Sequence, residues 1–161
     1  MGKRMHRAEQ IVDAARTLLA AAIEPTGVKC FVHRAETLDQ SQDELPATST
    51  DFGELTITEE TEDELYWSLT VPITAVVKLP SESEVKASLM TIARQIHLAI
   101  MATPAAGMPW KVTLGLAFVI TVHPLGWDAP EYDTRGEEIV GKLTTNWRVD
   151  FKTDVDDPGD A

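Results

Sequence analysis

The amino-acid sequence predicts an α+β fold in a single domain: a mostly antiparallel sheet of about four to five strands with two helices packed on one face. Two segments, 5–23 and 81–102, carry apolar residues at spacings of three and four, which is the period of an amphipathic helix. Three others, 65–79, 111–123 and 139–152, alternate apolar and polar residues, and only a strand has that period of two. We expect the domain to cover residues 1–152.

The two helices have recognisable ends. Pro25 and Gly27 follow the first helix and stop it, because proline cannot continue a helix and glycine favours its end. Ser81 and Glu84 form the capping-box pattern at the start of the second helix, which ends before Pro104. The apolar stripes consist of Ile11, Ala14, Leu18 and Ala22 in the first helix and of Val85, Leu89, Ile92 and Ile96 in the second.

Two shorter strands are expected between the first helix and the long alternating segment. Residues 28–33 are rich in β-branched and aromatic side chains, and a polar, turn-rich loop follows over 34–46. Residues 47–57 form a weaker strand, in which Thr48, Ser49 and Thr50 indicate an edge or a surface that a partner covers. The predicted element order is therefore α-β-β-β-α-β-β.

The long strand 65–79 contains Pro72, which has no N–H to donate, so we expect an edge or a bulge at that point. The acidic run 59–64, which precedes this strand, is interpreted as a hairpin tip. The segment 124–137, between the last two strands, is expected to be a long loop because it is rich in turn-forming residues. Residues 153–161 carry no apolar pattern, and we expect an acidic disordered tail there.

The net charge of the chain limits the classes of partner that we expect. The 26 Asp and Glu residues outnumber the 14 Lys and Arg residues, which leaves a formal charge of −12. Proteins that bind a phosphate backbone or an anionic membrane present basic surfaces, so neither is expected as the main partner. No apolar run is long enough to cross a membrane. No signal peptide is expected either, because Asp13 and Arg16 interrupt the stretch after the basic N-terminus, where a signal peptide would be apolar.

No pattern of an active site, metal site or cofactor site is found. The histidines, His6, His33, His97 and His123, lack the spacings at which imidazoles bind zinc. Nucleophile motifs such as G-x-S-x-G and glycine-rich phosphate loops are also missing. Cys30, the single cysteine, lies in a strand-like stretch and is interpreted as a core residue. We therefore predict no catalytic residue, no cofactor and no metal ligand.

The remaining candidates are surface residues. Trp127 and Tyr132 stand in the otherwise polar segment 124–137. Either they fold back over the open face of the sheet, or they dock a partner, since tryptophan and tyrosine are typical interface anchors. Trp67 and Trp147 share the apolar phase of their strands and are predicted to be core residues, whereas Trp110 is compatible with both.

The chain from about residue 6 to residue 152 resembles the tail terminator proteins of long-tailed bacteriophages, also called tail completion or minor tail proteins. The resemblance lies in the opening helix HRAEQIVDAARTLLAA, the strand VKCFVH followed by Arg34, and the loop that ends in DELPA. It continues through the strand ELYWSLTVPITAVVKL, the helix SEVKASLMTIARQIHLAIM and two closing strands.

The resemblance implies a virion protein at the head-proximal end of the tail, assembled in the cytoplasm of the bacterial host. Such proteins form a ring, usually a hexamer, that caps the tail tube, stops its polymerisation and docks the head connector. The expected partners are other copies of the chain, the major tail tube protein and the head–tail connector, with no membrane. DNA would pass through the ring without specific binding.

Two groups of residues are candidate sites within this interpretation. Trp127, Tyr132 and Arg34 are the candidate interface to a partner or to another copy. The acidic run, or the loop around Asp39 and Glu44, is the candidate lining of the DNA channel, because carboxylates repel phosphates. The candidate lumen residues of the acidic run are Glu59, Glu60, Glu62, Asp63 and Glu64.

Three alternatives from other classes stay open. A head–tail adaptor or a tail tube-like subunit is the nearest, and a tube subunit differs because it polymerises into long cylinders. A dimeric binding module would have a different native mass. A small metabolic enzyme is the most distant alternative, and a co-purifying ligand or metal would favour it.

Overall fold

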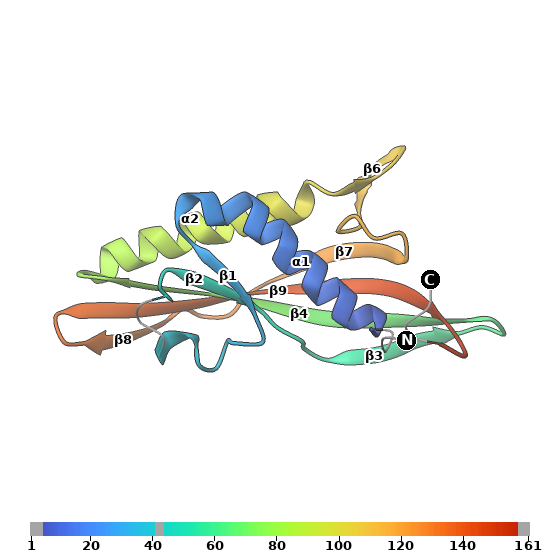
Figure 1. Ribbon diagram of the computed structural model, residues 1–161, viewed down its shortest axis with the longest axis horizontal. Helices are drawn as coiled ribbons and strands as arrows, with labels where there is room; N and C mark the ends of the chain where they lie inside the picture. Colours follow the sequence, from blue (N-terminus) through green and yellow to red (C-terminus); the bar gives the residue numbers. More distant parts are fainter. Residues whose placement is uncertain (1–4, 41–43, 158–161) are drawn as a thin grey trace.

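The structure is a computed structural model that describes residues 5–40 and 44–157 (Figure 1). The two helices of this part of the chain cover one face of a long, twisted sheet, and a small hairpin stands away from it (Figure 1). In chain order the elements are α1 (Arg7–Ile23), the 3-10 turn η1 (Glu24–Thr26), β1 (Lys29–Val32), the 3-10 turn η2 (Leu38–Gln40), β2 (Ala47–Thr50), β3 (Leu55–Glu60), β4 (Glu64–Leu79), α2 (Glu82–Met101), β5 (Pro104–Ala105), β6 (Met108–Val112), β7 (Val119–Trp127), β8 (Glu131–Arg135) and β9 (Glu138–Asp154).

The prediction of an α+β fold with a mostly antiparallel sheet is confirmed, but the predicted number and order of strands are wrong. Over the described residues the main sheet has seven strands, in the order β1-β2-β4-β9-β7, with β3 also paired to β4 and β8 also paired to β9. Only β1 and β2 run parallel. The central strands β4 and β9 pair without a break from Glu64–Asp154 to Leu79–Ile139, and they set the length of the molecule.

Both helices pack on the same face of the sheet, because alternate residues of the central strands are apolar. Leu69, Val71 and Ile73 of β4 join Trp147 and Val149 of β9 in one buried cluster beneath the helices. The helical members of this cluster are Ala8, Ile11, Val12, Ala15, Leu19 and Ile23 of α1 and Val85, Leu89, Ile92, Ala93, Ile96 and Ile100 of α2. Trp147 and Cys30 are buried, and Trp67 packs partly buried against the same cluster, as the sequence predicts.

The weak strand predicted over 47–57 is two strands, β2 and β3. The chain leaves the ladder between them, where Gly53 donates from its backbone nitrogen to Thr70 at 2.8 Å. A Cβ at position 53 would overlap the carbonyl oxygen of Thr70, so this close approach needs glycine. The gap lies opposite Pro72, which accepts a hydrogen bond from Asp51 but has no N–H for a neighbouring strand. Pro72 therefore lies in a central strand, at the point where the partner of β4 changes from β2 to β3.

The strand predicted over 111–123 is also two strands, in two different sheets. Met108–Val112 forms β6, which pairs with β5 in a separate hairpin, and β7 begins at Val119. Leu114 and Gly115, two consecutive residues, have φ angles of 55° and 75°, and this left-handed turn ends the strand. The alternation of apolar residues continues through this turn because Val112 and Leu114 are both buried.

The loop predicted over 124–137 is largely strand. The end of β7 and all of β8 pair with β9 along the same edge, with register shifts in β7 before Gly126. Their residues are mostly exposed, so no apolar alternation marks them in the sequence.

The predicted C-terminal tail begins later than expected, since Thr153 and Asp154 belong to β9. Residues 158–161 of that tail lie outside the described residues.

Candidate functional site

The face of the sheet away from the helices is polar and lacks a second layer over most of its described length. Cross-strand pairs on it include Ser68 with Asp150, Thr70 with Arg148 and Thr74 with Thr144. We call it the open face. Two of its basic groups lie near carboxylates: Arg148 Nε is 3.5 Å from Asp150 Oδ1, and Lys152 Nζ is 3.1 Å from Glu64 Oε1. A third, Lys142 Nζ, lies 3.4 Å from the carbonyl oxygen of Ala35.

The loop between β1 and β2 covers one end of the open face. Leu38 packs there in a second, smaller cluster with Ala47, Val76 and Val140. Ionic contacts hold the loop from outside, since the guanidinium of Arg135 lies 3.1 Å from Asp39 Oδ2. Asp39, a candidate for the DNA channel, is therefore engaged within the chain, and residues 41–43 of the same loop lie outside the described residues.

Arg34, a predicted interface residue, belongs to the same loop. Its guanidinium lies 4.4 Å from the ring centre of Phe31, and its Nη2 lies 2.8 Å from Glu44 Oε2. About a third of each of the two charged side chains stays exposed. Arg34 thus has a role in holding the loop, and its predicted role toward a partner stays a prediction.

The predicted acidic residues lie at the turn between β3 and β4, at one end of the sheet (Figure 1). Glu59, Glu60, Glu62 and Asp63 are exposed. Glu64 differs from them, because it accepts hydrogen bonds from Lys152 Nζ at 3.1 Å and from the Tyr66 hydroxyl at 2.9 Å. These bonds, first of all the one from Lys152, hold the pKa of Glu64 below its usual range.

The structure brings a second acidic segment to the same end. Asp154 pairs with Glu64, and the backbone nitrogen of Val155 donates to the carbonyl of Asp63 at 3.1 Å. Together the two segments surround a hollow of about 430 Å³, lined by Glu62, Asp63, Asp154, Val155, Asp156 and Asp157. We call these residues, with Glu59, Glu60 and Glu64, the acidic end. The sequence does not predict that the two acidic segments lie side by side, because only the register of β4 against β9 brings them together. Within residues 5–40 and 44–157, no group of three or more His, Cys, Asp or Glu side chains is arranged to hold a metal ion.

Trp127 and Tyr132 lie on the outer edge of the sheet, formed by β7 and β8. Trp127 pairs with Thr145 and Tyr132 with Gly141, and both of these β9 positions face the helices. The interpretation that the two aromatic side chains fold over the open face is therefore wrong. Their exposed fractions are 54% and 36%.

The ring of Tyr132 rests beside α2. Lys86 Nζ lies 5.6 Å from its centre, and a Cβ at Gly141 would touch the ring and overlap Val85. Trp127 has acidic residues beside it, of which Asp128 accepts a hydrogen bond from Asn146 at 2.9 Å. We call the group Trp127, Asp128, Glu131, Tyr132 and Asp133 the acidic edge.

The β5–β6 hairpin is a projection that sequence reasoning missed. Its base is fixed, since Thr113 donates to the Thr103 carbonyl and Leu114 to the Thr103 hydroxyl, both at 3.0 Å. Its tip stands away from the sheet (Figure 1). Trp110, for which the sequence left both a buried and an exposed position open, has an exposed fraction of 77%, and Met108 one of 38%.

The N-terminal end of α1 is held by a cluster of aromatic side chains around the buried side chain of Arg7. The Arg7 guanidinium lies 4.7 Å from the ring centre of Phe118 and donates to the carbonyl of Lys152. Phe151 packs between Phe118 and Trp67, and the ring of His6 meets Trp67 edge-on at 5.6 Å. Arg7 is nearly fully buried, and nothing in the helical pattern distinguishes it from the exposed basic residues of α1.

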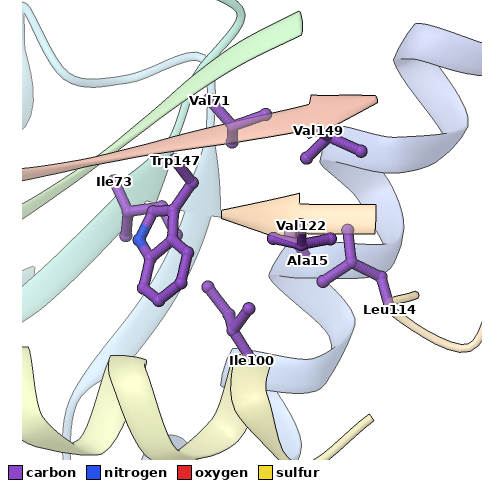
Figure 2. A pocket seen from close by; sticks show the side chains of 8 residues that line it. All are labelled: Ala15, Val71, Ile73, Ile100, Leu114, Val122, Trp147 and Val149. Carbon is purple, nitrogen blue, oxygen red and sulfur yellow. The ribbon is translucent and has the colours of Figure 1, made fainter. Parts of the chain in front are cut away.

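An internal cavity of about 10 Å³ lies where α1, α2 and the sheet meet (Figure 2). Its walls are entirely apolar, and the side chains that converge on it are Ala15, Val71, Ile73, Ile100, Leu114, Val122, Trp147 and Val149 (Figure 2). A space of this size holds no more than one water, and it offers that water no polar partner. It is therefore a gap in core packing and not a binding site.

Comparison with known proteins adds no assignment, because neither the protein-family models nor the curated proteins contain a match to this chain. Among the described residues, no helix is long and apolar enough to cross a membrane. The surfaces that could contact a partner are the open face, the acidic edge, the acidic end and the projecting hairpin.

Proposed function

We propose that this chain is a structural subunit of a bacteriophage tail, which forms a ring on the tail tube, ends tube polymerisation and docks the head connector. The resemblance of residues 6–152 to tail terminators gives the starting point. The observation that carries the proposal is that the sheet has two different unpaired edges, each with exposed apolar side chains. Phe52 and Ile57 mark one edge, and Leu125 and Trp127 mark the other.

Two different edges favour a head-to-tail assembly. A contact between one edge of a copy and the other edge of the next repeats around an axis, and it closes into a ring when the rotation per copy permits. Unpaired strand edges also join readily to further strands, because their backbone donors and acceptors are unsatisfied.

The open face suits the lumen of such a ring. β4 has 16 residues, so a wall built from it is about 50 Å long. Its small hydroxyl side chains bind phosphate weakly, and the basic groups of Arg148 and Lys152 are engaged by carboxylates. DNA would slide along this wall without a strong hold.

The acidic end would then form one mouth of the channel. Glu59, Glu60, Glu62 and Asp63 project beyond the open face at the β3–β4 turn, and the carboxylates after β9 lie beside them. Phosphates entering here would be repelled from the wall and guided toward the axis. Within this proposal the predicted acidic residues would lie at the rim of the channel and not along its wall.

The first test examines the assembly of a phage in which the gene for this chain is inactivated. We expect tail tubes of uncontrolled length that fail to join heads, and rescue by the wild-type chain supplied separately. Finished tails joined to capsids in the absence of the chain would overturn the proposal.

The second test uses the purified chain and electron microscopy. Rings that bind one end of preformed tubes and stop their growth support the proposal. Long cylinders formed by the chain alone would instead identify a tube subunit, and a native mass fixed at two copies would identify a dimeric module.

A further inference from the structure

We propose that the first turn of α1 is a latch, which is closed while His6 is neutral and opens when His6 is protonated, and that the buried charge of Arg7 drives the opening. In the closed state these two side chains rest on the aromatic rings of Trp67 and Phe118. The inference goes beyond the proposed ring, because it concerns a change within a single copy of the chain.

His6 can hold the first turn only while its imidazole is neutral. It is the N-cap residue of α1, and its Nδ1 accepts a hydrogen bond from the backbone nitrogen of Ala8 at 3.0 Å. An imidazolium carries a proton on both ring nitrogens, so it accepts no hydrogen bond. Protonation therefore removes the cap and leaves the N–H of Ala8, a fully buried residue, without its partner.

The ring of His6 also ties α1 to the sheet. It meets the ring of Trp67 edge-on at 5.6 Å, and Trp67 in turn stacks on Phe151 at 6.2 Å. The indole nitrogen of Trp67 donates to Thr153 Oγ1 at 2.9 Å. α1 begins over the half of the sheet that carries β3 (Figure 1). Displacement of His6 therefore loosens the contact of α1 with the adjoining ends of β4 and β9.

Arg7 is the group that gains most from opening. It is only 4% exposed. Among the described residues, its guanidinium donates to the carbonyl of Lys152 and rests 4.7 Å from the ring centre of Phe118, while its Nε has no hydrogen-bond partner. A carbonyl and a ring compensate a buried cation less fully than a paired carboxylate would. Water would hydrate all of its N–H donors, so Arg7 favours the open state once the cap is lost.

The charged groups beside His6 on α1 set the pH at which the latch opens. They are Arg7, the next residue, and Glu9, whose negative charge favours the protonated ring. Burial outweighs Glu9, so the pKa of His6 in the closed state lies below its usual value. The open state takes up the proton first, near pH 6.5, and the closed state is lost as the pH falls below that value.

The central strands add no titratable group on the side that faces His6. The residues beside Trp67 on that side of β4 and β9 are uncharged: Leu65, Phe151 and Thr153. Glu64 and Lys152 belong to the open face. On β3, Glu60 pairs with Leu65 and is exposed, so solvent and salt screen its charge. His6 is therefore the group on this side of the central strands that titrates near neutral pH.

The test follows amide hydrogen exchange of the full chain by NMR at about pH 7.5 and pH 5.5, with His6→Asn measured in parallel, because asparagine caps a helix without titrating. Relative to this variant, the first turn of α1 in wild type should exchange about fivefold faster at the lower pH, as expected for loss of a cap. The indole N–H of Trp67 should show the same acceleration.

Urea distinguishes opening of the latch from unfolding of the whole chain. Local opening exposes little surface, so exchange of the first turn should be faster than that of buried α2 amides and should depend less on urea. Equal rates and equal urea dependence for the first turn and α2 would show that the chain unfolds as one unit, and would overturn the latch.

Arg7→Met tests the driving charge. Methionine fills a similar space without a charge, so the first turn should exchange about threefold or more slowly than in wild type at pH 5.5. Faster exchange in this variant would show that Arg7 holds the turn closed, which contradicts the inference. Arg16→Met, a change on the same helix at a partly exposed residue, is the matched control and should leave the first turn unchanged.

His97→Asn is the control for histidine titration, since His97 lies 5.6 Å from Trp147 but caps no helix. It should leave the pH dependence of the first turn unchanged. The same pH dependence in wild type and His6→Asn would overturn the switch. None of these measurements requires assembly, so failure of the latch leaves the proposed ring untouched, and failure of the ring leaves the latch untouched.

Discussion

Glu64 and Asp154 stand directly opposite each other at the end of the two central strands, 90 positions apart in the sequence. Their pairing brings two acidic segments together and concentrates negative charge at one end of the molecule. Lys152, two residues before Asp154, offsets part of this charge through its contact with Glu64. The acidic end is thus a product of strand register.

Lys152→Gln should raise the pKa of Glu64 toward its ordinary value. The hydrogen bond from Lys152 is the main cause of the lowered pKa, and glutamine supplies neither the charge nor the same reach. The pKa is measured by carbon NMR of the Glu64 carboxyl group during a pH titration. Lys142→Gln, on the same strand but in contact with Ala35, is the control and should leave the pKa of Glu64 unchanged.

Protonation of His6 should destabilise the fold below neutral pH. Its Nδ1 accepts the hydrogen bond that caps α1, from the backbone nitrogen of Ala8 at 3.0 Å, and burial lowers its pKa although Glu9 opposes the shift. The unfolded chain therefore takes up the proton first, near pH 6.5. Stability is complete above that pH and is lost as the pH falls toward the lower pKa of the folded chain.

The variant His6→Asn isolates this contribution, because asparagine caps a helix without titrating. Urea unfolding at several pH values should show that wild type loses more stability than the variant between about pH 7.5 and pH 5.5. Parallel pH profiles for the two chains would show that His6 is not responsible.

Gly53→Ala should destabilise the fold by about 2 kcal/mol or more, because the new Cβ overlaps a backbone carbonyl that cannot move without disturbing β4. Gly107→Ala is the comparison. That position has open space around it and a φ of 72°, so its cost is about 1 kcal/mol from backbone strain alone. An equal loss in denaturant unfolding for the two variants would contradict the close approach at position 53.

Ile100→Ala should cost about 2 to 5 kcal/mol of stability, since it enlarges the cavity that Ile100 already lines. Leu98→Ala, two residues earlier on the exposed side of the same helix, should change stability by no more than about 0.5 kcal/mol. Chemical denaturation of both variants gives the comparison, and similar losses would place the two side chains in similar surroundings.

Reversal of charge at the acidic end should slow the passage of DNA. Glu59, Glu60 and Glu62 are exposed, so changing all three to Lys should leave the fold intact. The added positive charge would attract phosphates, giving measurable, salt-sensitive binding to duplex DNA and slower genome release from the virion. Unaltered release would remove these residues from the channel.

The sequence predicts the elements that bury a face. α1, α2, β4 and β9 lie close to their predicted bounds because core packing imposes periods of three to four in helices and of two in strands. The tryptophans that share this phase, Trp67 and Trp147, are also located correctly relative to the core. The candidate interface residues Trp127 and Tyr132 are recognised as exposed aromatic side chains, although their strands are not.

The elements that the sequence misses are those without a buried face. β8 and the end of β7 are exposed edge strands, held by backbone hydrogen bonds to β9, and such bonds leave no signature in residue type. The hairpin is missed for the opposite reason. Buried Val112 and Leu114 continue an apolar alternation across the turn that separates β6 from β7.

The sequence by itself determined the α+β class, the two helices, the long central strands and the negative charge, because each follows from residue type and local spacing. Only the tertiary structure decided that two acidic segments meet, that the hairpin stands away from the sheet, and that Trp127 lies on the outer edge of the sheet opposite Thr145. These relations depend on strand register and on contacts between residues far apart in the sequence, which no local pattern encodes.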